Sequence, residues 1–258
     1  MSAIVFLSDN LIETATSISL TTGTENAQFP LTNLEIDATV KKFRSQENSI
    51  VIEIDLGSTR PIDSVAVTGD ATESFEITSM SIKTSLTTDF TGSTAIPVTL
   101  SSEFNIGYEF FTEVSHRFVE ITLTGSGSFV EFSNLFIGKK IELTQQNLSL
   151  GSFRYQREDR TSIRQNKYGQ KFIDRRNIVK TISGSIEFAN QTEQETLDDM
   201  FLDRGESRPL WMIVDQNGAA MNDGEFKLAM YGYLERYPAW TANGGQLYSA
   251  SIQVRQVV

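Results

Sequence analysis

The chain has 258 residues, of which 39% are hydrophobic and 21% are charged, a composition typical of a folded globular protein. This length suits two ordinary domains or one large β domain. There is no cysteine, which excludes disulfides, thiol nucleophiles and cysteine-ligated metals. The sequence contains no run of 18 apolar residues, the length that a membrane-spanning helix needs, so we expect no membrane insertion.

The charge of the chain is unevenly distributed. Residues 1–138 carry 6 Lys and Arg against 18 Asp and Glu, whereas residues 139–258 carry 16 against 15. This asymmetry favours two units that meet different neighbours, and the acidic half is a poor nucleic-acid binder because it repels phosphates. The N-terminus lacks a basic segment and reaches Asp9 early, which argues against a secretion signal. We therefore expect folding in a cytoplasm.

Alternating apolar residues predict β-strands in the first half. Residues 49–56 alternate with the period of a strand, residues 57–58 predict a turn, and residues 61–67 predict a second strand. Further strands are expected at 76–84, 117–123 and 129–137. Short strands separated by turn residues, without a convincing helix, predict an all-β sandwich.

Short motifs in this half resemble the discoidin, or galactose-binding-like, family. They are PLTNL at 30–34, FRS at 43–45, IEIDLG at 52–57, IDSV at 62–65, HRFVEITL at 116–123 and FSNLFIG at 132–138. The resemblance covers residues 1–140 and implies a jelly-roll β-sandwich whose end loops often bind glycans or lipid surfaces. If this module binds a sugar, the loops near Phe43, Asp70 and Tyr108 are the expected site.

The chain departs from this family where a sugar would stack. Phe43 stands where the family usually has tryptophan, and residues 1–138 contain no tryptophan. The alternative is that Phe43 packs in the core. Asp37 and Asp55 suit a cation site, but carboxylates at strand ends are commonly turn formers and solvated charges. We expect neither a metal nor a cofactor.

The second half opens on a basic segment, residues 153–180, which is expected to form a loop and carries nine Lys or Arg and three acidic residues. Aromatic and isoleucine side chains are interleaved with these charges. The candidate contacts to a subunit or partner are Arg154, Arg157, Arg160, Arg164, Lys167, Lys171, Arg175 and Arg176.

Three interpretations of the basic segment are open. It is a nucleic-acid binder that tracks a backbone, a solvated hairpin without a partner, or an assembly arm that reaches a neighbouring subunit. We favour the arm, because a basic strip and an acidic half in one chain can pair between copies. Ile163, Ile173 and Ile178 would add apolar contact. Specific nucleic-acid binding is not expected.

A short helix is expected at about 192–203. Thr192 and Glu195 form a Thr-x-x-Glu capping box, and Gly205 is a suitable terminator. The apolar face of the helix is expected from Leu197, Met200, Phe201 and Leu202. Strands are expected around it at 181–188, 209–215, 226–234 and 246–255.

This order of strands, basic segment, helix and further strands resembles the tail-tube fold of tailed bacteriophages, which distal tail, baseplate hub and tube proteins share. The resemblance covers residues 139–258 and implies a β-sandwich with one flanking helix. We therefore expect a mainly β chain with two domains, a jelly-roll sandwich at 1–140 and a tail-tube-like sandwich at 141–258.

Enzyme motifs are missing from the sequence. His116 is the only histidine, and no Gly-x-Ser-x-Gly, P-loop or Gly-x-Gly-x-x-Gly sequence is present. The glycines of residues 125–128 predict a turn, since no helix follows to present its N-terminus to a phosphate. We expect no catalytic residues.

Together the two resemblances imply a structural component of a tailed-phage virion, assembled in the host cytoplasm. It would form a ring at the tail end, of a type that is usually hexameric, and join the tail tube to the tail tip or hub proteins. The alternative is a glycan-binding accessory protein that uses the N-terminal sandwich for attachment to a host surface.

Overall fold

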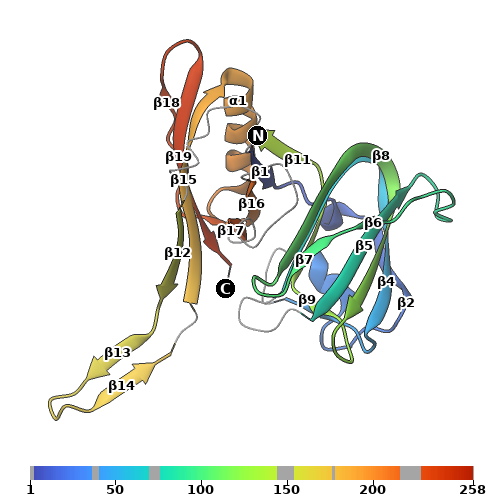
Figure 1. The fold of residues 1–258 in the computed structure, drawn as a ribbon, viewed down its shortest axis with the longest axis horizontal. Coiled ribbons are helices and arrows are strands. Elements are labelled where there is room, and N and C mark those ends of the chain that lie inside the picture. The colour runs from blue at the N-terminus through green and yellow to red at the C-terminus, as the bar shows by residue number, and fades with distance from the viewer. Residues whose placement is uncertain are drawn as a thin grey trace. The chain divides into compact units, whose positions relative to one another are not determined.

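A computed structural model describes residues 3–36, 41–69, 76–143, 154–175, 178–215 and 228–257. It confirms the expected fold class, because the chain is mainly β with antiparallel sandwich sheets and one α-helix in this described part (Figure 1). Asp37, Asp70 and Arg176 lie outside the described residues.

The chain divides into two compact units. The N-terminal unit comprises the described residues between Val5 and Glu142, and the C-terminal unit comprises Ala3, Ile4 and the described residues from Leu143 onward. The first strand, β1 (Ala3–Leu7), pairs within the sheet of the second half, next to β16 (Leu210–Asp215). Nothing in the local pattern of β1 identifies a partner strand about 200 residues away, so this pairing cannot be predicted from residues 3–7 alone.

The N-terminal unit is built on a seven-stranded sheet ordered β10-β4-β8-β5-β6, with β2 paired to β4 and β7 to β8. Its strands are β2 (Ser17–Thr22), β4 (Ser49–Thr68), β5 (Ile77–Ser85), β6 (Ile96–Pro97), β7 (Thr99–Ser101), β8 (Ile106–Gly125) and β10 (Asn134–Gly138). A separate pair joins β3 (Phe43–Arg44) to β9 (Glu131–Phe132), and two short 3-10 helices are η1 (Leu11–Thr14) and η2 (Leu31–Glu35).

The turn expected at residues 57–58 is wrong, because β4 is one strand of 20 residues. It pairs with β8 before and after this point, with a register shift between Asp55 and Arg60. Gly57 has φ of 76°, a left-handed conformation that glycine adopts without steric cost. Such an irregularity bends a strand without ending it, so a bulge and a turn leave the same glycine signal in the sequence.

A second sheet has eight strands ordered β11-β1-β16-β17-β19-β15-β12, with β18 paired to β19. Its strands from β12 onward lie in the C-terminal unit, and the boundary between the two units falls within β1 and β11. The remaining strands are β11 (Lys140–Leu143), β12 (Arg154–Asp159), β15 (Ile178–Asn190), β17 (Ala229–Leu234), β18 (Thr241–Ala242) and β19 (Leu247–Gln256). The helix α1 (Gln191–Arg204) packs against β15 and β19.

The expected helix is present, but its capping box lies two residues earlier. Asn190 accepts a hydrogen bond from the backbone N–H of Glu193 at 2.9 Å, and the Glu193 carboxylate accepts one from the Asn190 N–H at 3.0 Å. Two Asn/Thr-x-x-Glu patterns overlap in the sequence, and the asparagine pattern prevails. Gly205 ends the helix as expected. Leu202, expected on the buried face, is exposed, and Arg204 is buried there instead.

Candidate functional site

The basic segment forms strands where the sequence indicated a loop. Its first part is β12, which belongs to the large sheet, and its middle is a hairpin of β13 (Ser162–Gln165) and β14 (Lys171–Asp174). Figure 1 shows this hairpin extending beyond the ends of β12 and β15, away from the rest of the C-terminal unit. Neither strand pairs with the large sheet. Residues 162–175 are called the arm below.

The tip of the arm is a tight turn. The Gly169 N–H donates to the Asn166 carbonyl at 3.0 Å, and the Asn166 N–H donates to the Gln170 carbonyl at 3.0 Å. Gly169 has φ of 83°, which places it in the left-handed region that this kind of hairpin loop requires. The short polar sequence Asn-Lys-Tyr-Gly therefore specifies where the chain reverses.

Apolar side chains are exposed on both faces of the arm. Ile163 lies opposite Ile173, and Arg164 lies opposite Phe172. Because successive residues of a strand point to opposite faces, the isoleucines share one face and Phe172 lies on the other. Their exposed fractions are 64% for Ile163, 56% for Ile173 and 59% for Phe172. Neither face packs on the core formed by the described residues, and such a surface suits contact with a partner.

Seven of the eight candidate cations are described, and all seven are exposed: Arg154, Arg157, Arg160, Arg164, Lys167, Lys171 and Arg175. Arg160 lies 3.8 Å from the carboxylate of Glu158, and Lys167 lies 5.0 Å from the ring centre of Tyr168. Within the described part of the chain, Arg164, Lys171 and Arg175 form no ion pair. The charge of the arm is thus open to a partner.

The residues expected around a sugar site are buried where they are described. Phe43 is fully buried and packs on Phe132, with the ring centres 5.4 Å apart. Tyr108 is also buried, and its ring lies 5.5 Å from that of Phe110. Neither Phe43 nor Tyr108 offers a ring face to a sugar, so the core-packing interpretation of Phe43 describes the structure.

Asp55, considered above as a cation ligand, is held by Arg117. Nε and Nη2 of Arg117 each donate a hydrogen bond of 2.7 Å to the Asp55 carboxylate. These bonds hold the pKa of Asp55 below its ordinary value. Among the described residues, no group of three or more His, Asp or Glu side chains comes close enough to hold a metal ion.

His116 shares a hollow of the N-terminal unit with several hydroxyl side chains. Its Nδ1 lies 2.8 Å from Oγ1 of Thr84. The hollow is about 490 Å³ and also includes Leu86, Thr87 and Ser93. It is open and lined by hydroxyl, imidazole and aliphatic groups. Sequence reasoning missed this hollow, because its residues come from β5, β8 and the chain after β5.

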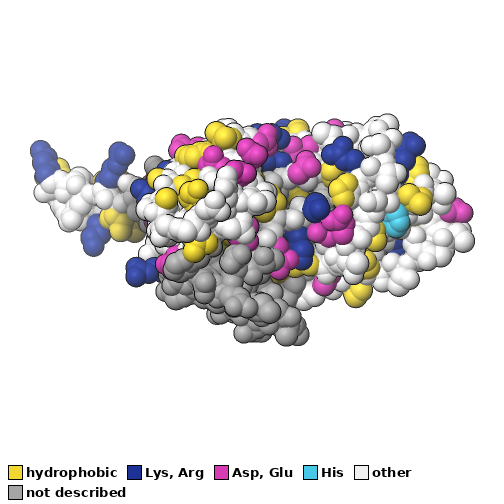
Figure 2. All heavy atoms as spheres, turned by 90° about the horizontal axis from the view of Figure 1, so that it is seen from above, with side chains coloured by type: hydrophobic (Ala, Val, Ile, Leu, Met, Phe, Trp, Pro, Cys, Tyr) yellow, Lys and Arg dark blue, Asp and Glu magenta, His cyan; other side chains and the backbone are white. Residues whose placement is uncertain are grey.

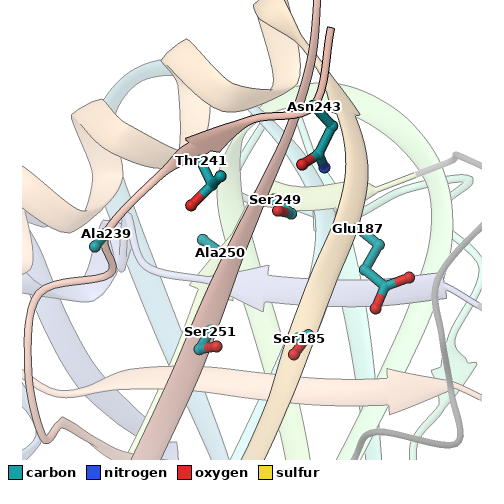
Figure 3. A pocket seen from close by; sticks show the side chains of 8 residues that line it. All are labelled: Ser185, Glu187, Ala239, Thr241, Asn243, Ser249, Ala250 and Ser251. Carbon is teal, nitrogen blue, oxygen red and sulfur yellow. The ribbon is translucent and has the colours of Figure 1, made fainter.

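A second hollow lies on the outer face of the C-terminal sheet (Figure 3). The side chains of β15 and β19 alternate there between the two faces of the sheet. Ile186 and Ile252 face the core, and serines lie on the outer face. The hollow is about 400 Å³, and its lining residues are Ser185, Glu187, Ala239, Thr241, Asn243, Ser249, Ala250 and Ser251. Glu187 is the one carboxylate in this lining, so the hollow lacks the paired acids of a glycosidase.

Comparison with family models and with curated proteins gave no match. Solved structures with a similar fold include chitosan-binding module 1 from a chitosanase/glucanase of Paenibacillus sp. IK-5, at 18% identity and a TM-score of 0.41, covering 50% of this chain and 98% of that one. Another is the family 32 carbohydrate-binding module of Clostridium perfringens NanJ in complex with galactose, at 16% identity and a TM-score of 0.41, covering 53% and 99%.

The lectin domain of lectinolysin, complexed with Lewis B antigen, matches at 11% identity with a TM-score of 0.43, covering 52% of this chain and 99% of that one. Each similarity extends over about half of this chain. None of the helices in the described part is long and apolar enough to cross a bilayer.

Proposed function

We propose that this chain is a non-catalytic assembly protein whose copies join through the arm. The observation that carries the proposal is the exposure of Ile163, Ile173 and Phe172 on both faces of a projecting hairpin. A two-stranded hairpin is only marginally stable in water by itself. Covering an isoleucine or phenylalanine side chain contributes about 1.5–3 kcal/mol. A partner surface therefore stabilises the arm while the arm holds the partner.

More specifically, we propose that the chain is a ring-forming component of a tailed-phage virion, at the distal tail or baseplate hub. The order of strands and helix in the C-terminal unit supports it through the tail-tube resemblance. The ring, of a type that is usually hexameric, would join the tail tube to the tail tip or hub proteins. The virion would be its location, after assembly in the host cytoplasm.

Removing the apolar contacts of the arm tests this function. The variant Ile163→Ser, Phe172→Ser, Ile173→Ser is expected to sediment as a single chain of 28.8 kDa. The unaltered protein is expected to sediment at a multiple of that mass. Sedimentation velocity at several protein concentrations measures both. The matched control is Leu86→Ser, which removes an equally exposed leucine from the N-terminal unit and should leave assembly intact.

Two results would reject the assembly function. One is an unaltered protein that sediments as a single chain at every concentration. The other is a triple variant that assembles as tightly as the unaltered protein. Circular dichroism of the triple variant shows whether the rest of the chain is folded.

A second candidate function is glycan binding by the N-terminal unit. The hollow at His116 favours it, because sugars offer hydroxyl groups and an apolar face. Thr84, Thr87 and Ser93 carry hydroxyls there, and the exposed side chain of Leu86 is apolar. This location differs from the loops near Phe43 and Tyr108.

Glycan binding is tested with the full chain on a glycan array, followed by calorimetry on any sugar that binds. His116→Ala is expected to weaken binding roughly tenfold, as for the loss of one or two hydrogen bonds. Leu202→Ala, in the C-terminal unit, is the control and should bind like the unaltered protein. Binding that survives His116→Ala and Leu86→Ala unchanged would remove this hollow from consideration.

A further inference from the structure

We infer that the arm of one copy docks on the outward face of α1 of a second copy. This inference rests on the proposed assembly function and names the acceptor surface for the arm. It follows from the charges and apolar groups of two elements of the same C-terminal unit.

The outward face of α1 is acidic. The helix carries five acidic residues and one basic residue. Glu195, Asp199 and Asp203 are spaced four residues apart, so they form one row along the helix, and all three are exposed. Like charges at this spacing repel each other and destabilise a helix. A cationic partner would relieve this repulsion.

The other acids of α1 face the protein's own side chains. The carboxylate of Asp198 accepts hydrogen bonds from the Tyr237 hydroxyl at 2.7 Å and from Nε1 of Trp240 at 3.0 Å. Burial and the hydrogen bond to Asp198 raise the pKa of Tyr237 to about 12, so the Tyr237 hydroxyl remains a hydrogen-bond donor. Glu193 is used in the capping box. The row facing solvent is therefore distinct from the acids that hold the helix in place.

Among the described residues, the carboxylates of the outward row have few compensating positive charges. Asp203 lies 3.5 Å from Nε of Arg204 and 3.6 Å from Nη1 of Arg208, which are long ion pairs. Glu195 accepts a hydrogen bond from Gln191. Asp199 forms no ion pair with any residue that the structure describes.

An exposed leucine lies within the acidic face. Leu202 precedes Asp203 and follows Asp199 by three residues, and its side chain is 66% exposed. The surface is thus a row of carboxylates with one apolar group beside it. A partner that matches it needs cations and apolar side chains together.

The arm has this composition. One face of its second strand, continued by one residue, carries Lys171, Ile173 and Arg175. Ile163 pairs with Ile173 on the same face. Residues 171 and 175 are about 13 Å apart along an extended chain. Glu195 and Asp203 are about 12 Å apart along the helix. Two cations can therefore meet the two ends of the acidic row while the isoleucines lie against Leu202.

The contact must form between copies. Within the C-terminal unit, the arm extends from the end of the sheet opposite to α1 (Figure 1), and Figure 2 shows its Lys and Arg side chains projecting clear of the body. An arm at one end and an acceptor at the other make a heterologous contact, which closes into a ring or continues as a filament.

Reversing the charges of α1 and of the arm tests whether α1 is the surface on which the arm docks. Glu195→Lys with Asp199→Lys should weaken self-association roughly tenfold, because two exposed attractive ion pairs become repulsive. Lys171→Glu with Arg175→Glu should do the same. Mixing the two variants, or combining all four substitutions, should restore association. The matched control is Glu35→Lys with Glu103→Lys, which makes the same charge change on exposed acids of the N-terminal unit.

The outcomes separate this inference from the proposed function. If the α1 variant assembles normally while the serine variant of the arm does not, the acceptor is wrong and the assembly function stands. If the two charge variants fail to restore each other, the pairing is also wrong. If nuclease treatment dissolves the assemblies, or the arm binds a fluorescent single-stranded oligonucleotide at physiological salt, a nucleic acid occupies the arm and the inference is overturned.

Discussion

Replacing Phe43 by alanine is expected to lower the free energy of unfolding by about 3–5 kcal/mol. The ring is fully buried and packs against Phe132, directly across from it in the β3–β9 pair. Truncation removes this contact and leaves a cavity in the core of the N-terminal unit. Urea unfolding followed by circular dichroism measures the loss.

Phe43→Leu is the control for this prediction, because it retains most of the apolar volume and should cost much less. A sugar-binding role for Phe43 makes the opposite prediction, since an exposed stacking ring contributes little to stability. An unfolding midpoint of Phe43→Ala equal to that of the unaltered protein would therefore contradict the core-packing interpretation.

The second large effect is expected at Trp211 in the C-terminal unit. Trp211→Ala should lower the free energy of unfolding by about 3–5 kcal/mol. The indole is buried on β16 and packs on Tyr231 of β17, with ring centres 5.4 Å apart. The same urea titration, read by circular dichroism, measures this loss.

Trp211→Phe should cost clearly less than the alanine variant. Nε1 of Trp211 is buried and has no hydrogen-bond acceptor among the described residues. Phenylalanine removes that unsatisfied N–H, which offsets part of the lost packing. Equal losses for Trp211→Phe and Trp211→Ala would show that the aromatic packing described here is not what stabilises the unit.

The local strand pattern is readable from the sequence because burial repeats every second residue. Ile50, Ile52 and Ile54 are all fully buried, as their alternation predicts. The break at Gly57 is not readable in the same way. Whether a glycine ends a strand or bends it depends on the partner strand β8, which continues past it and holds both parts of β4 in one ladder.

In the arm, too, some features can be predicted from the local sequence, whereas others depend on how the strands pair. Its charge, its interleaved isoleucines and its turn at Gly169 are visible in the sequence. Its pairing of Ile163 with Ile173, and hence the exposure of apolar groups on both faces, depends on hairpin register. The acidic row of α1 is equally visible in the sequence. The sequence does not show which of these acids face solvent, because the bonds of Asp198 to Tyr237 and Trp240 depend on the fold.

Amide hydrogen exchange in the arm tests most directly whether copies join there. At a protein concentration where the chain assembles, the amides of β13 and β14 are predicted to exchange at least about tenfold more slowly than after dilution to single chains, because an isolated hairpin opens readily. Exchange that is equally fast at both concentrations would contradict docking of the arm on another copy.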